Sequence, residues 1–310
     1  MEIFSKQCFD QDLESSFNLG IFTSGYEPRS TFLFSKGLTI TNTIVLGFAS
    51  FKDHKSRKKN DRVFTKKGCD IINSDGNNPI IIHQLLNNYL QDFTGEIFKI
   101  FVDYSSMTRV WYAEILAYFR DAEDLKFSVE LVFGYSFAKY QAPPEENYRN
   151  LYVSPIDGFS YFSVPNKPTA LIIGLGYEKN KAFGLSEYFD GETFVFYNKD
   201  SNDERFKESV EKINGSLLEI IPEENKYIFP IYDLEFTERQ LFSICGYLKE
   251  TFRVIVAPTG PKPFTLVSLI IALKMNEIDV WRISQGDNRK AIQFEADGNI
   301  SLYKVTFRYV

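Results

Sequence analysis

The sequence predicts an α/β fold built from two tandem copies of one unit. Three observations carry this prediction: short apolar runs alternate with helical patterns, four segments recur in the same order, and a turn-forming run separates the two copies. Short apolar strands that alternate with helices are typical of βαβ units and of a mostly parallel sheet. We therefore expect two Rossmann-like domains, residues 1–165 and residues 166–310, each with a mainly parallel sheet.

The four recurring segments are expected to be strands. Segments 22–27, 43–49, 98–103 and 131–136 match segments 173–178, 193–198, 252–257 and 279–284. The offsets between the copies are 151, 150, 154 and 148 residues. Because nearly constant spacing over four elements is difficult to obtain by chance, it indicates an internal repeat with a pseudo-two-fold relation.

Helical patterns lie between these strands, at 85–93, 111–119, 201–214, 236–251 and 264–274. Each copy is expected to end in an appended β-hairpin, because an Asp-Gly pair interrupts the last apolar run of each copy. These pairs are Asp157-Gly158 within 150–164 and Asp297-Gly298 within 291–310. The boundary between the copies is placed at the Pro-Asn-Lys-Pro run of 165–168.

Composition limits the classes of partner. The 310 residues are 44% apolar and 25% charged, and 30 Phe and 18 Tyr predict a Phe-rich core. The net charge of −6 argues against duplex DNA and anionic membranes as partners. No apolar run reaches the roughly 18 residues of a membrane helix. Three widely separated cysteines without a signal peptide predict a reduced, cytoplasmic location.

One segment departs from the acidic average. Residues 52–67 hold eight basic residues against two acidic ones. We expect a solvated, mobile loop, and the alternative is a flap that steers an anion into a ligand site.

Each copy has one candidate ligand loop directly after its opening strand. Parallel α/β sheets bind ligands at the carboxyl ends of their strands. The candidate residues of the two loops are Gly25, Tyr26, Glu27 and Arg29, and Gly176, Tyr177, Glu178 and Lys181. Glycine lets the backbone approach a ligand, tyrosine offers a ring to a base, and the cations suit phosphate. The alternative is a strand-to-helix turn whose tyrosine packs on the core.

Two further loops follow segments 98–103 and 252–257. Their candidate residues are Ser105, Ser106, Thr108 and Arg109, and Thr259, Gly260 and Lys262. Hydroxyls, backbone N–H groups and a cation at a helix start suit a phosphate or a ribose. The alternative is a capped helix start with an incidental cation. Neither loop is a Walker A or GxGxxG motif.

The run from Asp103 to Arg109 resembles the strand-four signature of the CRISPR-associated Rossmann-fold (CARF) sensor domains. That signature is a polar or acidic residue, an apolar one, Ser or Thr, a small pair, Thr and a cation. This chain departs from it at Tyr104 and Met107, and the second copy matches only at Thr259-Gly260 and Lys262. The resemblance covers about ten residues per copy. It implies a two-domain pocket that binds oligonucleotide second messengers, usually in antiviral defence.

Three functions remain open from the residues. The first is a nucleotide or oligonucleotide second-messenger binding module that acts through a partner effector protein. The second is an enzyme of the same fold, either a phosphodiesterase (ring nuclease) or a nucleotide-dependent transferase. The third is a structural subunit of a larger complex.

Glu27 and Glu178 occupy equivalent positions in the two copies. We expect either that they form an acid–base pair or that each caps its own helix. Because His54 and His83 are the only histidines, we expect no metal centre and no cofactor.

Overall fold

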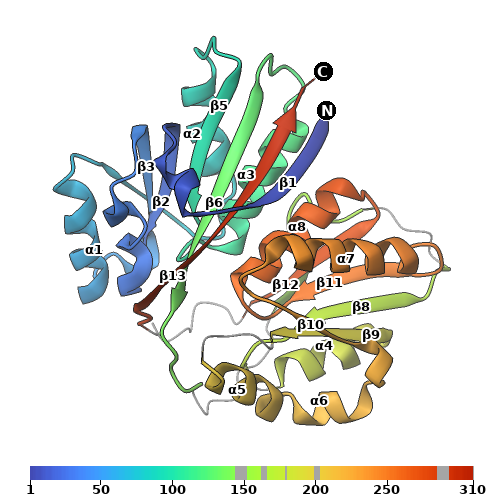
Figure 1. The fold of residues 1–310 in the computed structure, drawn as a ribbon. Coiled ribbons are helices and arrows are strands. Elements are labelled where there is room, and N and C mark those ends of the chain that lie inside the picture. Colours follow the sequence, from blue (N-terminus) through green and yellow to red (C-terminus); the bar gives the residue numbers. More distant parts are fainter. Residues whose placement is uncertain (144–151, 162–165, 179, 199–202, 285–292, 310) are drawn as a thin grey trace. The chain divides into compact units, whose positions relative to one another are not determined.

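The computed structural model of the chain describes residues 1–143, 152–161, 166–178, 180–198, 203–284 and 293–309. The chain divides into two compact units (Figure 1). Unit 1 contains Met1–Lys139 and Lys290–Val310, and unit 2 contains Tyr140–Arg289.

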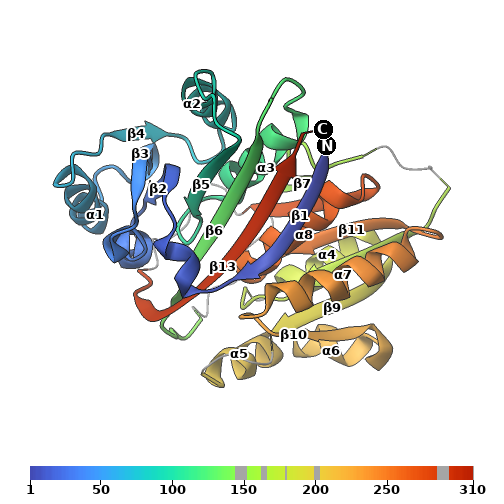
Figure 2. The same cartoon turned by 45° about the horizontal axis from the view of Figure 1, so that its top comes forward.

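The sheet of unit 1 has seven strands in the order β1-β13-β6-β5-β2-β3-β4 (Figure 2). The bounds are β1 Glu2–Cys8, β2 Phe17–Ser24, β3 Ile40–Phe48, β4 Ile71–Ser74, β5 Ile97–Asp103, β6 Ser128–Ala138 and β13 Ala296–Arg308. Neighbouring strands from β4 to β6 are parallel, whereas β13 is antiparallel to both β6 and β1. The parallel strands are nearly continuous buried runs, as expected when helices cover both faces.

The helices of unit 1 are α1 Lys55–Thr65, α2 Ile80–Leu90 and α3 Arg109–Asp121, with the 3₁₀ turns η1 Asp10–Glu14, η2 Pro28–Thr31, η3 Phe34–Lys36 and η4 Ala49–Phe51. Helix α1 packs on β2, β4 and η2, and α2 packs on α3. A cluster of phenylalanines lies beneath α1, with Phe22 in contact with Phe34, Phe64 and Phe101. The prediction of a Phe-rich core is confirmed for this unit.

The sheet of unit 2 has six strands in the order β10-β9-β8-β11-β12-β7. The bounds are β7 Tyr152–Pro155, β8 Thr169–Gly174, β9 Glu192–Asn198, β10 Lys226–Phe229, β11 Arg253–Pro258 and β12 Ile278–Ser284. The helices are α4 Lys181–Phe189, α5 Arg205–Ile213, α6 Gly215–Ile220, α7 Leu234–Leu248 and α8 Lys262–Lys274, and η5 is Glu223–Asn225. Helices α7 and α8 cover one face, and α4, α5 and α6 cover the other (Figure 1).

The two units share one strand order, so the predicted internal repeat is confirmed. The order β4-β3-β2-β5-β6 in unit 1 corresponds to β10-β9-β8-β11-β12 in unit 2, with all neighbours parallel. Each sheet then continues with one antiparallel strand, β13 beside β6 and β7 beside β12. This is a mainly parallel Rossmann-like fold in both units.

The strand registers confirm three of the four predicted alignments. Thr23 lies opposite Leu46, and the residues 151 and 150 positions later, Gly174 and Phe196, also lie opposite each other. The offset of 154 between β5 and β11 is preserved in the same way. The alignment of 131–136 with 279–284 is wrong by one residue, because the ladders require an offset of 147. Consecutive residues are buried in both strands, so the apolar pattern does not fix their register.

The two predicted terminal hairpins are wrong. Strand β7 pairs with β12, and the residues that follow Asp157-Gly158, up to 161, form no strand. The rest of the first predicted hairpin lies outside the described residues. Asp297 and Gly298 lie within β13, where the ladder with β6 shifts register and Gly298 has a φ of 103°. The second Asp-Gly pair therefore forms a bulge and not a hairpin turn.

The last strand of each repeat completes the sheet of the other repeat. Strand β7 follows β6 along the chain but joins β12, and β13 follows β12 but joins β6. The compact units therefore differ from the predicted domains 1–165 and 166–310. The physical reason is that β6 and β12 each present an open edge that an antiparallel strand must cover, and an apolar strand pattern does not specify which edge it will cover.

We expect a fragment of residues 1–165 not to fold, because it lacks β13. Leu302, Tyr303, Val305 and Phe307 of this strand are all buried. At about 1.5–3 kcal/mol for each buried side chain, their loss matches the 5–15 kcal/mol stability of a whole domain. Circular dichroism and urea unfolding would measure this.

The matched control joins residue 139 to residue 293 through a short Gly-Ser linker. The backbone N of Lys139 lies 2.9 Å from the carbonyl oxygen of Glu295, so the connection is short. This chain keeps every strand of the unit 1 sheet and should unfold cooperatively. Cooperative unfolding of the 1–165 fragment would contradict the account.

Candidate functional site

Two of the predicted loops meet at the carboxyl edge of the unit 1 sheet. One follows β2 and begins at Gly25, and the other follows β5 and leads into α3. A Cβ atom placed on Gly25 would lie 3.3 Å from Cβ of Ser106 and 3.8 Å from its Oγ. Only glycine permits this approach without displacement, so the structure brings the two predicted loops of this unit together.

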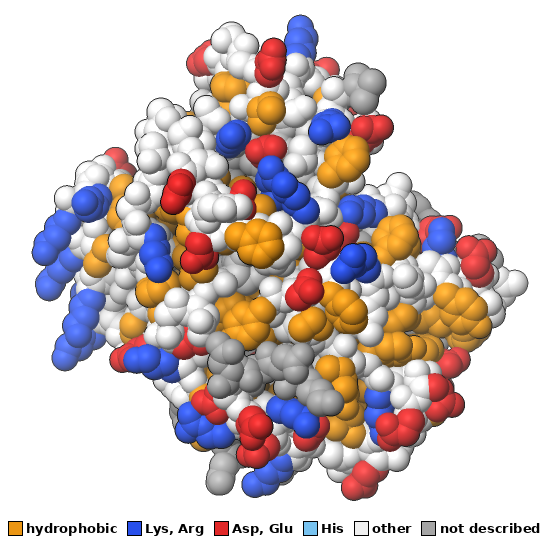
Figure 3. All heavy atoms as spheres, viewed as in Figure 1, with side chains coloured by type: hydrophobic (Ala, Val, Ile, Leu, Met, Phe, Trp, Pro, Cys, Tyr) orange, Lys and Arg blue, Asp and Glu red, His pale blue; other side chains and the backbone are white. Residues whose placement is uncertain are grey.

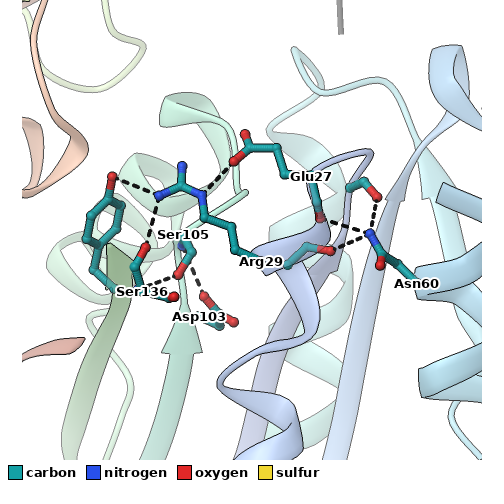
Figure 4. Close-up of polar contacts among 9 residues, drawn as sticks. Glu27, Arg29, Asn60, Asp103, Ser105 and Ser136 are labelled. Carbon is teal, nitrogen blue, oxygen red and sulfur yellow. Dashed lines mark hydrogen bonds and ion pairs between the residues drawn. The ribbon is translucent and has the colours of Figure 1, made fainter. Parts of the chain in front are cut away.

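Asn60 of α1 holds the loop after β2 (Figure 4). Its side-chain Nδ2 lies 2.9 Å from the carbonyl oxygens of Gly25 and Glu27 and from Oγ of Ser30. Asn60 is buried. Its amide supplies the donors that these loop acceptors require away from water.

Arg29 is buried within the same loop. Its Nε donates to Oε2 of Glu27 at 2.6 Å, and its Nη1 donates to the carbonyl oxygen of Ser136 at 2.9 Å and to the hydroxyl of Tyr135 at 3.2 Å (Figure 4). Burial opposes the charged form, but Tyr135 and Glu27 outweigh it and raise the pKa of Arg29 above its ordinary value. Glu27 is the N-cap residue of η2, but its side chain makes no cap hydrogen bond and pairs with Arg29.

The turn between β5 and α3 is ordered by its own side chains. Oδ1 of Asp103 accepts from the backbone N of Ser105 at 3.0 Å, and Oγ of Ser105 accepts from the backbone N of Ser136 at 2.8 Å. Thr108 caps α3, since its Oγ1 accepts from the backbone N of Trp111 at 3.3 Å. Thr108 therefore fits the alternative of a capped helix start, whereas Ser105 ties the turn to β6.

Ser106 differs from its neighbours in this turn. Its side chain is 7% exposed, and its Oγ has no hydrogen-bond partner among the described residues. A buried hydroxyl without a partner is unfavourable, and such groups in a folded protein indicate strain, an unseen water or a ligand. Ser106 lies three residues before the first residue of α3, Arg109, which is half-buried. The fold thus leaves a donor at a helix N-terminus on the ligand-binding edge of the sheet.

The two residues that depart from the sensor signature belong to the core. Tyr104 and Met107 are both fully buried, and the Tyr104 ring contacts the rings of Tyr112 and Tyr135. Burial raises the pKa of Tyr104 well above its ordinary value. The backbones of these two residues belong to the turn, but their side chains fill the interior.

The loop after β8 repeats the interactions of the loop after β2. Nδ2 of Asn214 donates to the carbonyl oxygen of Gly176 at 2.9 Å, as Asn60 does to Gly25. The buried Lys181 forms an ion pair with Glu178, as Arg29 does with Glu27. The sequence analysis missed both asparagines. Their offset of 154 residues equals the offset of β5 and β11, and a longer repeat alignment would have found them.

The turn between β11 and α8 has lost the features of its counterpart. Oγ1 of Thr259 donates to the carbonyl oxygen of Gly174 at 2.7 Å. A Cβ atom on Gly260 would lie 2.3 Å from the carbonyl oxygen of Leu175, so the two loops are in backbone contact. Pro261 and Pro263 flank Lys262 at the start of α8 and have no N–H group to donate. The two units are therefore chemically unequal at this position.

Tyr26 and Tyr177 occupy matching positions and both pack on a phenylalanine. The Tyr26 ring lies 4.5 Å from Phe51, and the Tyr177 ring lies 6.0 Å from Phe206 in a stacked orientation. Both tyrosines remain partly exposed. This arrangement is compatible with a lid on the core and with a platform for a base.

The basic segment 52–67 contains helix α1, so the prediction of a mobile loop is wrong. Arg57 is fully buried and donates to Oδ1 of Asp61 at 2.6 Å, to the carbonyl oxygen of Phe48 at 2.8 Å and to Oδ1 of Asn73 at 2.8 Å. Asn60 and Phe64 continue the buried face. The contacts of Arg57 with Phe48 of β3 and Asn73 of β4 anchor the segment to the sheet.

The two histidines have local partners. Nδ1 of His54 accepts from the backbone N of Ser56 and caps α1, and His83 of α2 pairs with Glu114 of α3. In the described ranges, no group of three or more His, Cys, Asp or Glu residues could hold a metal ion. No helix in that part of the chain is long and apolar enough to cross a membrane.

Comparisons with known proteins add no family. No protein-family model matches the chain, and no curated protein matches it. Among solved structures, it is similar to Haemonchus contortus phosphoethanolamine N-methyltransferase 1 in complex with phosphoethanolamine and S-adenosylhomocysteine. The identity is 9% and the TM-score is 0.21, over 96% of this chain and 92% of that chain. That likeness carries no argument, so the fold assignment rests on strand order and register.

We expect Ser105→Ala and Ser106→Ala to differ in stability. Ser105→Ala leaves the buried N–H of Ser136 without its acceptor, which should lower the free energy of unfolding by about 1–3 kcal/mol. Ser106→Ala removes a hydroxyl that has no partner among the described residues, so stability should stay the same or rise slightly. Urea unfolding of both variants measures the difference. An equal loss in both would show that Ser106 supports the fold.

Proposed function

We propose that the chain is a nucleotide-binding module whose ligand phosphate binds in unit 1, at the turn between β5 and α3. The observation that carries the proposal is the buried Ser106 hydroxyl, which has no partner among the described residues. It lies beside Gly25, near the N-terminus of α3 and at the carboxyl edge of a parallel sheet. Parallel α/β sheets bind phosphate groups at such an edge, where a strand leads into a helix.

The surroundings of Ser106 suit an anion. Arg109 is the first residue of α3, and the helix dipole places partial positive charge at the same end. Arg29 is held at Nε and Nη1, and no described residue accepts a hydrogen bond from its Nη2 (Figure 4). A guanidinium held at Nε and Nη1 whose Nη2 is not used by a described residue is pre-organised to donate to a phosphate oxygen.

The resemblance to the CARF sensor domains supports a finer proposal. The turn that carries the resemblance follows β5, which is the fourth of the parallel strands β2, β3, β4, β5 and β6 in chain order. On this basis the ligand is a nucleotide or a short oligonucleotide second messenger, and its binding is transmitted to a partner effector protein in a defence system. Unit 2 then supports the fold, since its matching turn is occupied by its own backbone contacts.

The ion pairs of Glu27 and Glu178 favour binding over acid–base chemistry. Each carboxylate is paired with a cation of its own loop. Each ion pair directs its carboxylate to a side chain of its own loop, whereas acid–base catalysis requires a carboxylate within hydrogen-bond reach of the ligand. Assays for turnover of the bound nucleotide would separate a sensor from a phosphodiesterase of the same fold.

We expect Ser106→Ala and Arg109→Ala each to weaken nucleotide binding by roughly ten- to a hundredfold, because hydrogen bonds to charged groups contribute about 1.5–3 kcal/mol. The ligand is first identified by mass spectrometry of the nucleotides that heat releases from the purified protein. Calorimetry then gives the affinity of each variant.

Lys262→Ala is the matched control for Arg109→Ala, because Lys262 opens α8 as Arg109 opens α3. Its effect on affinity should be less than about threefold, since the prolines beside it remove backbone donors. A larger loss of nucleotide affinity in Lys262→Ala than in Arg109→Ala would indicate that the site lies in unit 2. Unchanged affinity in Ser106→Ala would contradict the proposal.

A further inference from the structure

Helix α1 and its flanking residues carry a dense set of exposed cations. Arg57 is buried, and the seven other basic residues of segment 52–67 are exposed: Lys52, Lys55, Lys58, Lys59, Arg62, Lys66 and Lys67. In Figure 3, Lys and Arg side chains gather along the left edge of the molecule, over α1. This cationic face contrasts with the net charge of −6 for the whole chain.

Nearly all of this charge lacks a compensating carboxylate. Lys58 pairs with Asp53 at 3.0 Å, and both side chains are well exposed. Asp61, the other acidic residue of the segment, pairs with the buried Arg57. Within the described part of the chain, the remaining six exposed cations form no ion pair. The described residues therefore leave most of this positive surface without a paired carboxylate.

The arrangement of these cations opposes the stability of α1. Lys55 and Lys59, and likewise Lys58 and Arg62, are like charges four residues apart, and such pairs destabilise a helix. Lys55 opens the helix, and its first turn has no acidic residue, although the helix dipole favours negative charge there. A sequence that accepts these costs is expected to use the cations in contact with another molecule.

Partly exposed rings lie at the N-terminal end of the cationic face. The Tyr26 ring lies 4.5 Å from the Phe51 ring and 6.2 Å from the ring of His54, which caps α1. Rings beside a row of cations are the combination that binds single-stranded nucleic acid, because the cations follow the phosphates and the rings stack on unpaired bases.

We propose that α1, together with Tyr26, Phe51 and His54, forms a binding surface for a single-stranded nucleic acid. Phosphates lie along the exposed cations, and bases stack on the rings. A duplex satisfies only the first of these contacts, since its bases are stacked on one another. This surface does not depend on the nucleotide site proposed at Ser106, and a different variant tests it.

Fluorescence anisotropy with labelled oligo(dT), labelled oligo(U) and a duplex of the same length tests the proposal. We expect both single strands to bind more tightly than the duplex, and the ratio of oligo(U) to oligo(dT) affinity shows which sugar is preferred. For single strands the logarithm of the binding constant falls with the logarithm of salt concentration by about 0.7 for each phosphate contact.

The triple variant Lys55→Gln, Lys59→Gln and Arg62→Gln should weaken binding at least about tenfold and make the salt slope shallower by about 2, or 0.7 for each lost contact. Its melting temperature should stay the same or rise, because like charges are removed. The control triple Lys6→Gln, Lys36→Gln and Lys126→Gln changes net charge equally at exposed positions outside α1. Its affinity should remain within about twofold.

Phe51→Ala should weaken single-strand binding by roughly tenfold and leave the salt slope unchanged, because a stacking contact involves no phosphate. Equal affinity for duplex and single strand, with no effect of Phe51→Ala, would overturn the proposal and show a surface for any polyanion, including an acidic protein. Equal losses in the two triple variants would also overturn it. The loss caused by the triple variant on α1 should be equally large when Ser106→Ala is also present, which separates failure here from failure of the nucleotide site.

Discussion

The pairing of β13 with β6 is the contact on which the unit 1 site depends. Strand β6 supplies Tyr135 and Ser136, which hold Arg29, and the backbone N of Ser136 donates to Ser105. Strand β13 fixes this part of β6 through the ladder from Ala296 to Phe307. The segment just before β13 also reaches the site directly, since the backbone N of Arg29 donates to the carbonyl oxygen of Phe294 at 3.2 Å. The C-terminal end of the chain thus positions a loop near its N-terminal end.

Comparison of the two repeats separates what the fold requires from what a ligand would require. Asn60 and Asn214 each donate to the carbonyl oxygen of a glycine in the loop that follows a central strand, and a cation pairs with the nearby glutamate in both units. The asparagine contacts satisfy backbone acceptors in these loops, as any version of the fold must, and the ion pairs neutralise the buried cations. The turns into α3 and α8 have diverged, and only the first keeps a buried hydroxyl without a partner among the described residues.

The sequence predicted the central strands because parallel strands covered on both faces are short, uninterrupted apolar runs. It missed β4 and β10, which have four residues each and too little pattern to detect. It also missed the exchange of β7 and β13, because an apolar strand pattern shows that a strand needs an edge but not which edge it covers. Helix α1 was not predicted because the buried face of this helix lacks the usual apolar pattern. Arg57 and Asn60 lie on that face, where apolar residues are expected.

The candidate site was predicted in part. Both loops of unit 1 were predicted as ligand loops because parallel α/β sheets bind ligands at the carboxyl ends of their strands, but that these two loops lie side by side was not predicted. The sequence could not predict that Ser105 has a hydrogen-bond partner and that Ser106 has none among the described residues. This difference depends on the strand register that places Ser136 beside Ser105. The sequence also could not predict the partners of Arg29 on β6, because they lie more than a hundred positions away along the chain.

Hydrogen exchange of the backbone tests the central claim most directly. The exchange of purified protein, stripped of bound nucleotide, is compared with and without the nucleotide that it releases. Our account predicts slower exchange in peptides that cover the loop after β2 and the first turn of α3, with no change at the start of α8. Protection at α8 without protection at α3, or no change in either turn, would contradict the assignment of the site to unit 1.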